Sequence, residues 1–262
     1  MTHRAKKSLG QHFLRSAGAI RMIVSSGDVT DKDIVLEIGP GEGVLTESLL
    51  NTGAKVIAVE FDRSLIPILE ERFATQIKSG QLNLVEQDIL KFDPESYKLK
   101  AGNYKLVANI PYYITGAIFE KFLTEKTPPS CLVVLIQKEV ATRIVARDKK
   151  ESILSISVKA FGTPKITMKV PASAFRPAPK VDSAILVVNN VSQANFKGLN
   201  TDHFFKVVKA GFAHKRKLLA RNLETVAEKE SIQKAFIESD VHINARAEDV
   251  PLETWFRISR AL

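Results

Sequence analysis

The sequence contains a single cysteine, Cys131, and this scarcity excludes two kinds of stabilising site. No intramolecular disulfide can form, and a zinc site built from several cysteines is impossible. Cys131 opens the apolar run 131–136, so we interpret it as a buried structural thiol. We therefore expect a fold that depends on a hydrophobic core rather than on covalent cross-links.

Long hydrophobic runs are also missing. No segment approaches the run of about 20 apolar residues that spans a bilayer, and residues 1–7 are polar and basic, unlike the apolar centre of a secretory signal. We therefore expect a soluble, cytoplasmic protein with no membrane partner. The 262 residues, of which 45% are hydrophobic, suffice for one large domain and a smaller one.

Acidic residues are absent from two stretches of an otherwise mixed chain. In total 38 basic residues outnumber 29 acidic ones, which gives a net charge of +9. Residues 1–27 contain no Asp or Glu, and neither do residues 205–221. A solvated helix face usually mixes the two signs, so these basic blocks favour a surface that contacts nucleic-acid phosphates.

Short apolar runs alternate with helical segments from residue 33 onward. The runs expected to be strands are 33–38, 55–59, 82–85, 104–108 and 131–136. The segments with helical spacing are 44–50, 64–73 and 116–123. Repeated β-α-β units of this kind predict an α/β fold, in which helices cover both faces of a parallel sheet.

The pattern changes after about residue 150. We expect a helix at 153–160, strands at 165–170 and 184–188, and short helices from about residue 200. The stretch 175–181 is too rich in proline for a regular element.

A polar stretch near residue 190 suggests a domain boundary. It divides the chain into a catalytic domain over 1–190, which includes the basic N-terminal segment, and a small helical domain over 191–262.

A glycine-rich segment, Glu37-Ile38-Gly39-Pro40-Gly41-Glu42-Gly43, joins the first expected strand to the first expected helix. Its glycines permit a sharp turn and let a ligand approach the backbone. In an open α/β sheet, ligands bind beyond the carboxyl ends of the strands, where this loop falls. The last glycine comes two residues after the second rather than three, so the match to the dinucleotide fingerprint is imperfect.

Acidic residues end the next two expected strands. Glu60 lies about 20 positions after Gly39, where a carboxylate can accept hydrogen bonds from ribose hydroxyls. Asp88 ends the third strand and is placed to accept from an adenine amine. Either residue alone is explained equally well as a helix cap. Three such features on successive strand ends favour a nucleoside cofactor, and both NAD and S-adenosylmethionine have the ribose and adenine that this requires.

The segment Asn109-Ile110-Pro111-Tyr112 follows the fourth expected strand and fits methylation of an exocyclic adenine amine. The Asn109 side-chain oxygen and the Ile110 carbonyl can accept the two N–H bonds of that amine and stabilise charge as the methyl arrives. Pro111 restricts Ile110 to an extended conformation, and Tyr112 offers a stacking face for an extruded base. Because S-adenosylmethionine is already a sulfonium cation, we expect neither a metal nor a strong general base.

These motifs resemble the ribosomal RNA adenine N6,N6-dimethyltransferase family over nearly the whole chain. The matching segments are 9–14, 35–41, 59–60, 87–88, 109–112, 137–141, 175–184 and 212–217. The long match at 175–184 is the most specific of them. Two departures stand out: His12 replaces the family's usual asparagine, and residues 150–156 lack a Tyr-Gly pair that commonly precedes a Leu-Ser-Val run.

The resemblance implies a Rossmann-like S-adenosylmethionine-dependent methyltransferase sheet with a small C-terminal helical domain. It implies these cofactor contacts: His12, Leu14, Gly39, Gly41, Glu60, Asp88 and Asn109. It further implies that Asn109 and Tyr112 are catalytic, and that Lys215, Arg216 and Lys217 bind RNA. Bacterial members of the family dimethylate two adjacent adenines near the 3′ end of 16S rRNA in the 30S subunit, and we expect this chain to do so as a monomer.

Three alternatives stay open. A sister group of the family dimethylates 23S rRNA and confers macrolide resistance, although the Pro-Lys-Val-Asp-Ser-Ala sequence at 179–184 and the basic C-terminal helices favour the small-subunit enzyme. An NAD-dependent dehydrogenase is suggested only by the glycine loop and Glu60. A non-catalytic assembly or nucleic-acid-binding factor would not require the intact motif at 109–112.

Overall fold

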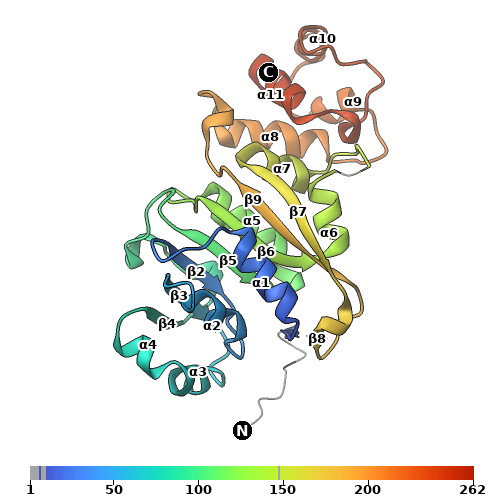
Figure 1. Cartoon of the computed structure of the whole chain (residues 1–262). Coiled ribbons are helices and arrows are strands. Elements are labelled where there is room, and N and C mark those ends of the chain that lie inside the picture. Colours follow the sequence, from blue (N-terminus) through green and yellow to red (C-terminus); the bar gives the residue numbers. More distant parts are fainter. Residues whose placement is uncertain (1–5, 7–9, 147) are drawn as a thin grey trace. The chain divides into compact units, whose positions relative to one another are not determined.

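The computed structural model of the chain describes residues 6, 10–146 and 148–262 (Figure 1). Leu9 of the N-terminal motif and most of the basic segment 1–7 lie outside the described residues. The chain divides into two compact units, one made of residues 1–141 and 163–192, the other of 142–162 and 193–262. Residues 142–162, which the sequence assigned to a domain spanning 1–190, thus cluster with the C-terminal residues.

The first unit is built on a seven-stranded sheet in the order β4-β3-β2-β5-β6-β9-β7. Its strands are β2 (Ile34–Ile38), β3 (Lys55–Glu60), β4 (Leu82–Glu86), β5 (Lys105–Asn109), β6 (Cys131–Gln137), β7 (Thr163–Val170) and β9 (Ser183–Asn189). Neighbouring strands from β4 to β6 are parallel, whereas β9 is antiparallel to both β6 and β7. The α/β sheet expected from the repeated units is confirmed, with one reversed strand near its edge.

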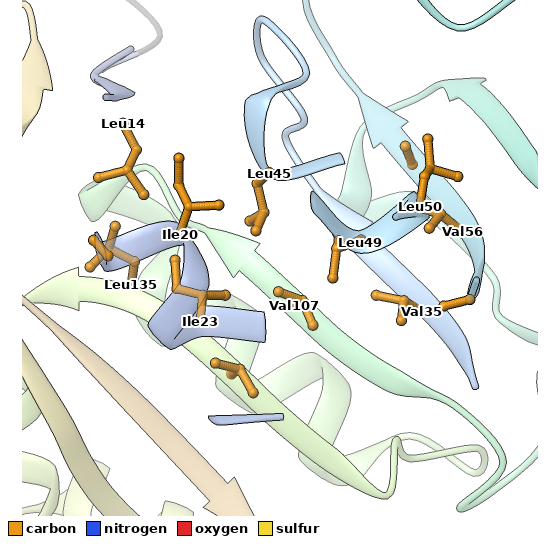
Figure 2. Packing of buried hydrophobic residues seen from close by; sticks show 14 of the residues in the cluster. Leu14, Ile20, Ile23, Val35, Leu45, Leu49, Leu50, Val56, Val107 and Leu135 are labelled. Atoms are coloured by element: carbon orange, nitrogen blue, oxygen red, sulfur yellow. The ribbon is translucent and has the colours of Figure 1, made fainter. Parts of the chain in front are cut away.

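The helices of this unit are α1 (Ala17–Ser26), α2 (Val44–Leu50), α3 (Ile66–Arg72), α4 (Ala74–Lys78) and α5 (Thr115–Thr124). A further helix, α6 (Lys138–Ile144), continues into the second unit. Side chains on α1 and α2, such as Ile23 and Leu49, pack on Val35 and Val107 of the sheet (Figure 2). These four side chains are fully buried, so this face of the sheet forms a hydrophobic core of the kind that the apolar runs predicted.

The strand order places a switch point between β2 and β5. After β2, the next two strands, β3 and β4, are added on one side of β2, and β5 is then added on its other side. In open α/β sheets, ligands bind at the carboxyl ends of the strands at such a point. The glycine loop after β2 and the Asn109 motif at the end of β5 therefore come together at one edge of the sheet.

The expectation that 175–181 contains no regular element was wrong for its first two residues. Phe175–Arg176 form strand β8, which pairs antiparallel with strand β1 (Phe13–Leu14). Both residues precede Pro177, so their backbone N–H groups remain available for pairing. This two-stranded ribbon ties the N-terminal motif to the proline-rich loop. Cys131 is buried, as predicted.

The second unit consists of helices, which confirms the short helices expected after residue 200. They are α7 (Ile153–Phe161), α8 (Thr201–Gly211), α9 (Leu219–Leu223), α10 (Lys229–Glu238) and α11 (Leu252–Ala261). Helix α7 belongs here because Phe161 contacts the rings of Phe196 and Phe205. At its start, where the family's Tyr-Gly pair is missing, Ser152 and Ser155 form a reciprocal N-terminal cap.

None of the helices in the described part of the chain combines the length and hydrophobicity needed to cross a membrane.

Candidate active site

A cavity of about 290 Å³ opens at the carboxyl ends of the parallel strands, within the first unit. Its lining includes every residue that the sequence assigned to cofactor binding or catalysis, namely His12, Leu14, Gly39, Gly41, Glu60, Asp88, Asn109 and Tyr112. Residues nearly 100 positions apart thus meet in one place, because successive parallel strands end at the same edge of the sheet.

The glycine loop has a backbone that other residues rarely adopt. Gly39 and Gly41 have φ angles of 66° and 59°, in the left-handed region where a Cβ atom is strained. A Cβ on Gly41 would also lie 3.0 Å from the Phe13 ring. The loop therefore exposes bare backbone to the cavity, as close binding of a cofactor requires.

Glu60 ends β3 with its carboxylate held between two main-chain amides. One side-chain oxygen accepts from the Asp62 N–H at 2.8 Å, and the other from the Gly41 N–H at 3.1 Å. Burial raises the pKa of Glu60, although these hydrogen bonds act in the opposite direction. Each carboxylate oxygen has two acceptor positions, so the carboxylate that orders the loop can also accept from hydroxyls in the cavity.

Asp88 stands after β4 and caps a short 3₁₀ helix, Ile89–Lys91. Its Oδ1 atom accepts from the Leu90 N–H at 3.0 Å. The interpretation of Asp88 as a helix cap is therefore confirmed, since its Oδ1 atom caps this 3₁₀ helix. The cap also fixes the orientation of the carboxylate, whose remaining acceptor positions are available to an amine in the cavity.

Asn109, the last residue of β5, is oriented through its side-chain nitrogen. Its Nδ2 atom donates to the main-chain carbonyl of His12 at 3.1 Å. Because a carbonyl only accepts, this contact settles which end of the amide is nitrogen and which is oxygen. The neighbouring Ile110 is buried, and its N–H donates to the Leu135 carbonyl at 3.3 Å.

Tyr112 begins a 3₁₀ helix, Tyr112–Ile114, and its ring lines the cavity. The hydroxyl lies 2.8 Å from the Oγ atom of Ser183, which is completely buried at the start of β9. Burial raises the pKa of Tyr112, so the phenol stays neutral over the physiological range. The sequence pattern did not single out Ser183, because only strand pairing brings it here.

A polar network missed by the sequence ties the N-terminal segment to the end of β3. The Asp62 carboxylate accepts from the Lys6 ammonium at 2.6 Å and from the Gln11 amide at 2.7 Å. Burial raises the pKa of Asp62, but hydrogen bonds from Lys6, Ser64 and Gln11 outweigh it and hold that pKa well below its usual range. Asp62 lies two residues after Glu60, which is the only signal the sequence offered.

Glu37, in β2, is a fully buried carboxyl beneath the glycine loop. Neither of its oxygens has a hydrogen-bond partner among the described residues, and the same is true of the Thr46 hydroxyl on α2. Burial raises the pKa of Glu37 to about 8, and the nearby Glu60 carboxylate acts in the same direction. The acid is therefore mostly protonated at neutral pH when nothing else is bound nearby.

The second unit presents the expected RNA-binding residues on an exposed loop between α8 and α9. Lys215, Arg216 and Lys217 are all exposed. The buried Asn222 anchors this loop, because its Nδ2 donates to the carbonyls of Gly211 at 2.6 Å and His214 at 3.1 Å. We refer to residues 215–217 as the basic loop.

Within the described ranges, no group of three or more His, Cys, Asp or Glu side chains is arranged to hold a metal ion.

Comparisons with known proteins agree with this geometry. The model of the family described as ribosomal RNA adenine dimethylase matches residues 2–262. The ribosomal RNA small subunit methyltransferase A of Dehalococcoides mccartyi (strain BAV1) is 40% identical in an alignment 262 residues long. The alignment covers 98% of this chain and 88% of that protein.

Two solved structures are similar over most of their length. A dimethyladenosine transferase from Plasmodium falciparum has a TM-score of 0.79 at 25% identity and covers 94% of this chain and 96% of its own. The 23S rRNA methyltransferase ErmE has a TM-score of 0.77 at 26% identity, and the match covers 95% of this chain and 99% of ErmE. Together with the match over the whole chain, these likenesses show that the protein belongs to the ribosomal RNA adenine dimethylase family, a family of methyltransferases with a Rossmann-like fold.

Proposed function

We propose that the chain transfers methyl groups from S-adenosylmethionine to N6 of two adjacent adenines near the 3′ end of 16S rRNA, within the 30S particle. Each adenine receives two methyl groups, so each particle accepts four. The observation that carries the proposal is the fixed amide of Asn109, which bonds His12 through nitrogen and so keeps its oxygen for an amine. The relatives named small subunit methyltransferase A favour 16S over 23S rRNA as the substrate.

The cavity residues fit the nucleoside part of S-adenosylmethionine. Glu60 would hold the ribose hydroxyls, because its carboxylate keeps acceptor positions beside the two amides that it already binds. Asp88 would accept from the adenine amine of the cofactor. The bare backbone at Gly39 and Gly41 admits close approach, and His12 and Leu14 would close the cavity from the N-terminal side.

Asn109 and Ile110 would bind the amine that is methylated. The nitrogen lone pair of an adenine amine is delocalised into the ring, so the amine is a weak nucleophile. Acceptors on both N–H bonds favour a tetrahedral nitrogen and stabilise its positive charge as the N–C bond forms. The Asn109 Oδ1 atom and the Ile110 carbonyl are suited to this role, since the His12 carbonyl holds the Asn109 amide and Ile110 is hydrogen-bonded to Leu135 of β6.

Tyr112 would receive the face of the flipped base. Its hydroxyl is tied to Ser183, so the ring is held at a fixed angle beside Asn109. When bound, S-adenosylmethionine would supply a methyl group on a sulfonium. The S–C bond breaks as the N–C bond forms, S-adenosylhomocysteine leaves, and the methylated amine becomes neutral by losing one N–H proton. The protein residues then act mainly by orientation, which accounts for large rate enhancements when reacting atoms are aligned.

The basic loop would contact RNA phosphates outside the cavity. Its three cations are exposed and held on an anchored loop, an arrangement that suits phosphate binding better than a flexible tail. We further propose that the protein acts as a monomer in the cytoplasm, where ribosomal particles are assembled, and that it uses no metal.

Labelled S-adenosylmethionine tests this function. The protein would be mixed with undermethylated 30S particles and, separately, with 23S rRNA, and the RNA digested to nucleosides. We expect label in N6,N6-dimethyladenosine from 30S particles alone. Label from 23S rRNA alone would assign the protein to the group that contains ErmE, and no label in either RNA would contradict a methyltransferase function.

A further inference from the structure

His12 makes three separate contacts, two of them with residues that line the part of the cavity that would hold the target base. Its main-chain carbonyl accepts from Asn109 Nδ2 at 3.1 Å. Its ring atom Nδ1 lies 2.7 Å from the carbonyl oxygen of Pro177. Its ring lies beside that of Tyr112, with centroids 6.1 Å apart and planes inclined by 25°. One residue thus contacts both proposed catalytic side chains and the proline-rich loop.

The hydrogen bond to Pro177 fixes the state of the imidazole. A carbonyl oxygen only accepts, so Nδ1 must carry the proton and donate it. This orientation is backed by the pairing of β1 with β8, in which Phe13 lies opposite Arg176. The ring is therefore held by a loop that is itself hydrogen-bonded to the same N-terminal segment.

The segment that carries His12 is also anchored at the cofactor side of the cavity. Gln11 donates to the buried Asp62 carboxylate at 2.7 Å. The Asp62 N–H in turn donates to Glu60, the proposed ribose ligand. Residues 10–14, which we call the N-terminal strap, therefore connect the cofactor side of the cavity with the target-base side.

We propose that His12 is a positioning residue for methyl transfer: its side chain, by donating to Pro177, holds the strap where its carbonyl orients the amide of Asn109. This inference rests on the proposed function and adds a role for His12 beyond contact with the cofactor. If the Pro177 contact is lost, the strap shifts, the carbonyl leaves Asn109, and the amide is free to rotate. A displacement of about 1 Å in such a group costs up to a hundredfold in rate.

Three substitutions at His12 separate the hydrogen bond from the ring. His12→Asn keeps a donor, because the Nδ2 atom of asparagine and the Nδ1 atom of histidine are both attached to Cγ. His12→Phe keeps a ring but has no donor, and His12→Ala has neither. A matched control is His203→Asn, which alters a histidine whose ring contacts a carbonyl, that of Ser259 at 2.9 Å, in the second unit.

The readout is the single-turnover rate of methyl transfer to 30S particles, at saturating cofactor and RNA. We expect His12→Asn and the control to stay within about threefold of the wild type, and His12→Phe and His12→Ala to lose about 10- to 100-fold. The dissociation constant for S-adenosylhomocysteine should change by less than about threefold. Wild-type rates for His12→Ala, losses that appear only when the cofactor is below saturation, or a rate kept by Phe and lost by Asn would each overturn the proposal.

The imidazole tautomer gives a readout that does not depend on activity. In a spectrum of protein labelled with ¹⁵N-histidine at about pH 9, where ordinary histidines are neutral, the His12 signal is the one missing from His12→Asn. We expect a protonated Nδ1 and an unprotonated Nε2, the reverse of the usual tautomer. A protonated Nε2 would overturn the inference even if the enzyme is active, whereas absence of methylation by the wild type would overturn the proposed function.

Discussion

The Tyr112 hydroxyl lies 2.8 Å from the Oγ atom of Ser183, which comes from a strand more than 70 positions further along the chain. Ser183 has no exposed surface, so this hydrogen bond is partly shielded from water. It determines how the Tyr112 ring faces the cavity, and through that ring how a flipped base would stack.

Removing either hydroxyl should therefore have the same effect. We expect Tyr112→Phe and Ser183→Ala each to lower the single-turnover rate of methyl transfer about 3- to 10-fold, and the double variant to lose no more than the larger single loss. A double-mutant cycle measures this. Fully additive losses would mean that the two hydroxyls act separately, which would contradict a positioning role for Ser183.

Glu60→Gln should weaken cofactor binding about tenfold. Both carboxylate oxygens accept from main-chain amides, those of Gly41 and Asp62, and a glutamine can accept on only one side. The substitution therefore disturbs the glycine loop and removes an acceptor for ribose. Calorimetric titration with S-adenosylhomocysteine measures the change. A matched control is Glu86→Gln, at the end of the neighbouring strand, where the side chain is half-exposed and pairs with Arg63. An unchanged dissociation constant for Glu60→Gln would remove Glu60 from the cofactor site.

The buried Glu37 should make the stability of the free protein fall as the pH rises. Its pKa in the folded protein is raised to about 8, from an ordinary value of 4.5. The folded state then binds more protons than the unfolded state between these two values, so the free energy of unfolding declines as the pH rises through this window. We expect the free energy of unfolding of the wild type to fall by several kcal/mol between about pH 5 and about pH 8, relative to that of Glu37→Gln.

Denaturant unfolding of the two proteins at several pH values tests this expectation. Glutamine has nearly the same shape as a protonated glutamate but does not titrate in this range. Parallel curves for the two proteins would show that Glu37 does not bind a proton on folding.

Gly211→Ala should destabilise the second unit by about 1–3 kcal/mol. A Cβ at this position, at the end of α8, would overlap the ring of Trp255 and lie 2.8 Å from Leu219. Trp255 is fully buried, so its ring cannot move aside without a cost to the packing around it. Thermal unfolding measures the loss, with Gly116→Ala as a control, because Gly116 is also helical but no atom lies within 4 Å of a Cβ there. Equal effects of both substitutions would mean that the ring contact does not decide the outcome.

Reversing the charges of the basic loop should weaken binding to 30S particles about 10- to 100-fold and flatten its dependence on salt, because about three phosphate contacts are lost. The variant carries Lys215→Glu, Arg216→Glu and Lys217→Glu. A control with the same change in net charge carries Lys32→Glu, Lys55→Glu and Lys100→Glu. These exposed positions lie before a parallel strand or, for Lys55, at its first residue, and none of them lines the cavity. Equal losses in both variants would indicate a general effect of net charge rather than a site.

Sequence patterns predicted the sheet well because a strand buried on both faces must be apolar over its buried length, as β6 is over residues 131–136. They did not predict that β9 runs antiparallel, since an apolar run has no direction until its neighbours are known. The short strand β8 was missed for a related reason. Phe175 and Arg176 are regular only because β1 pairs with them.

The same limit applies to the site. Gly39, Glu60, Asp88 and Asn109 could be identified because each ends or closely follows a strand, and strand ends meet at a known edge. Ser183, Gln11 and Asp62 act through partners that are distant in sequence, and no local pattern indicates such pairs. The side-chain role of His12 was hidden in the same way, since its partner Pro177 lies 165 residues away.

The most direct test of the central claim is the single-turnover methylation of undermethylated 30S particles by the wild type and by Asn109→Ala, with the methylated positions mapped on the RNA. We expect the wild type to place two methyl groups on N6 of each of two adjacent adenines near the 3′ end of 16S rRNA. The Asn109→Ala variant should be slower by about 100-fold or more, with cofactor affinity reduced only modestly. Methylation at another nucleotide, or an undiminished rate without Asn109, would contradict the account.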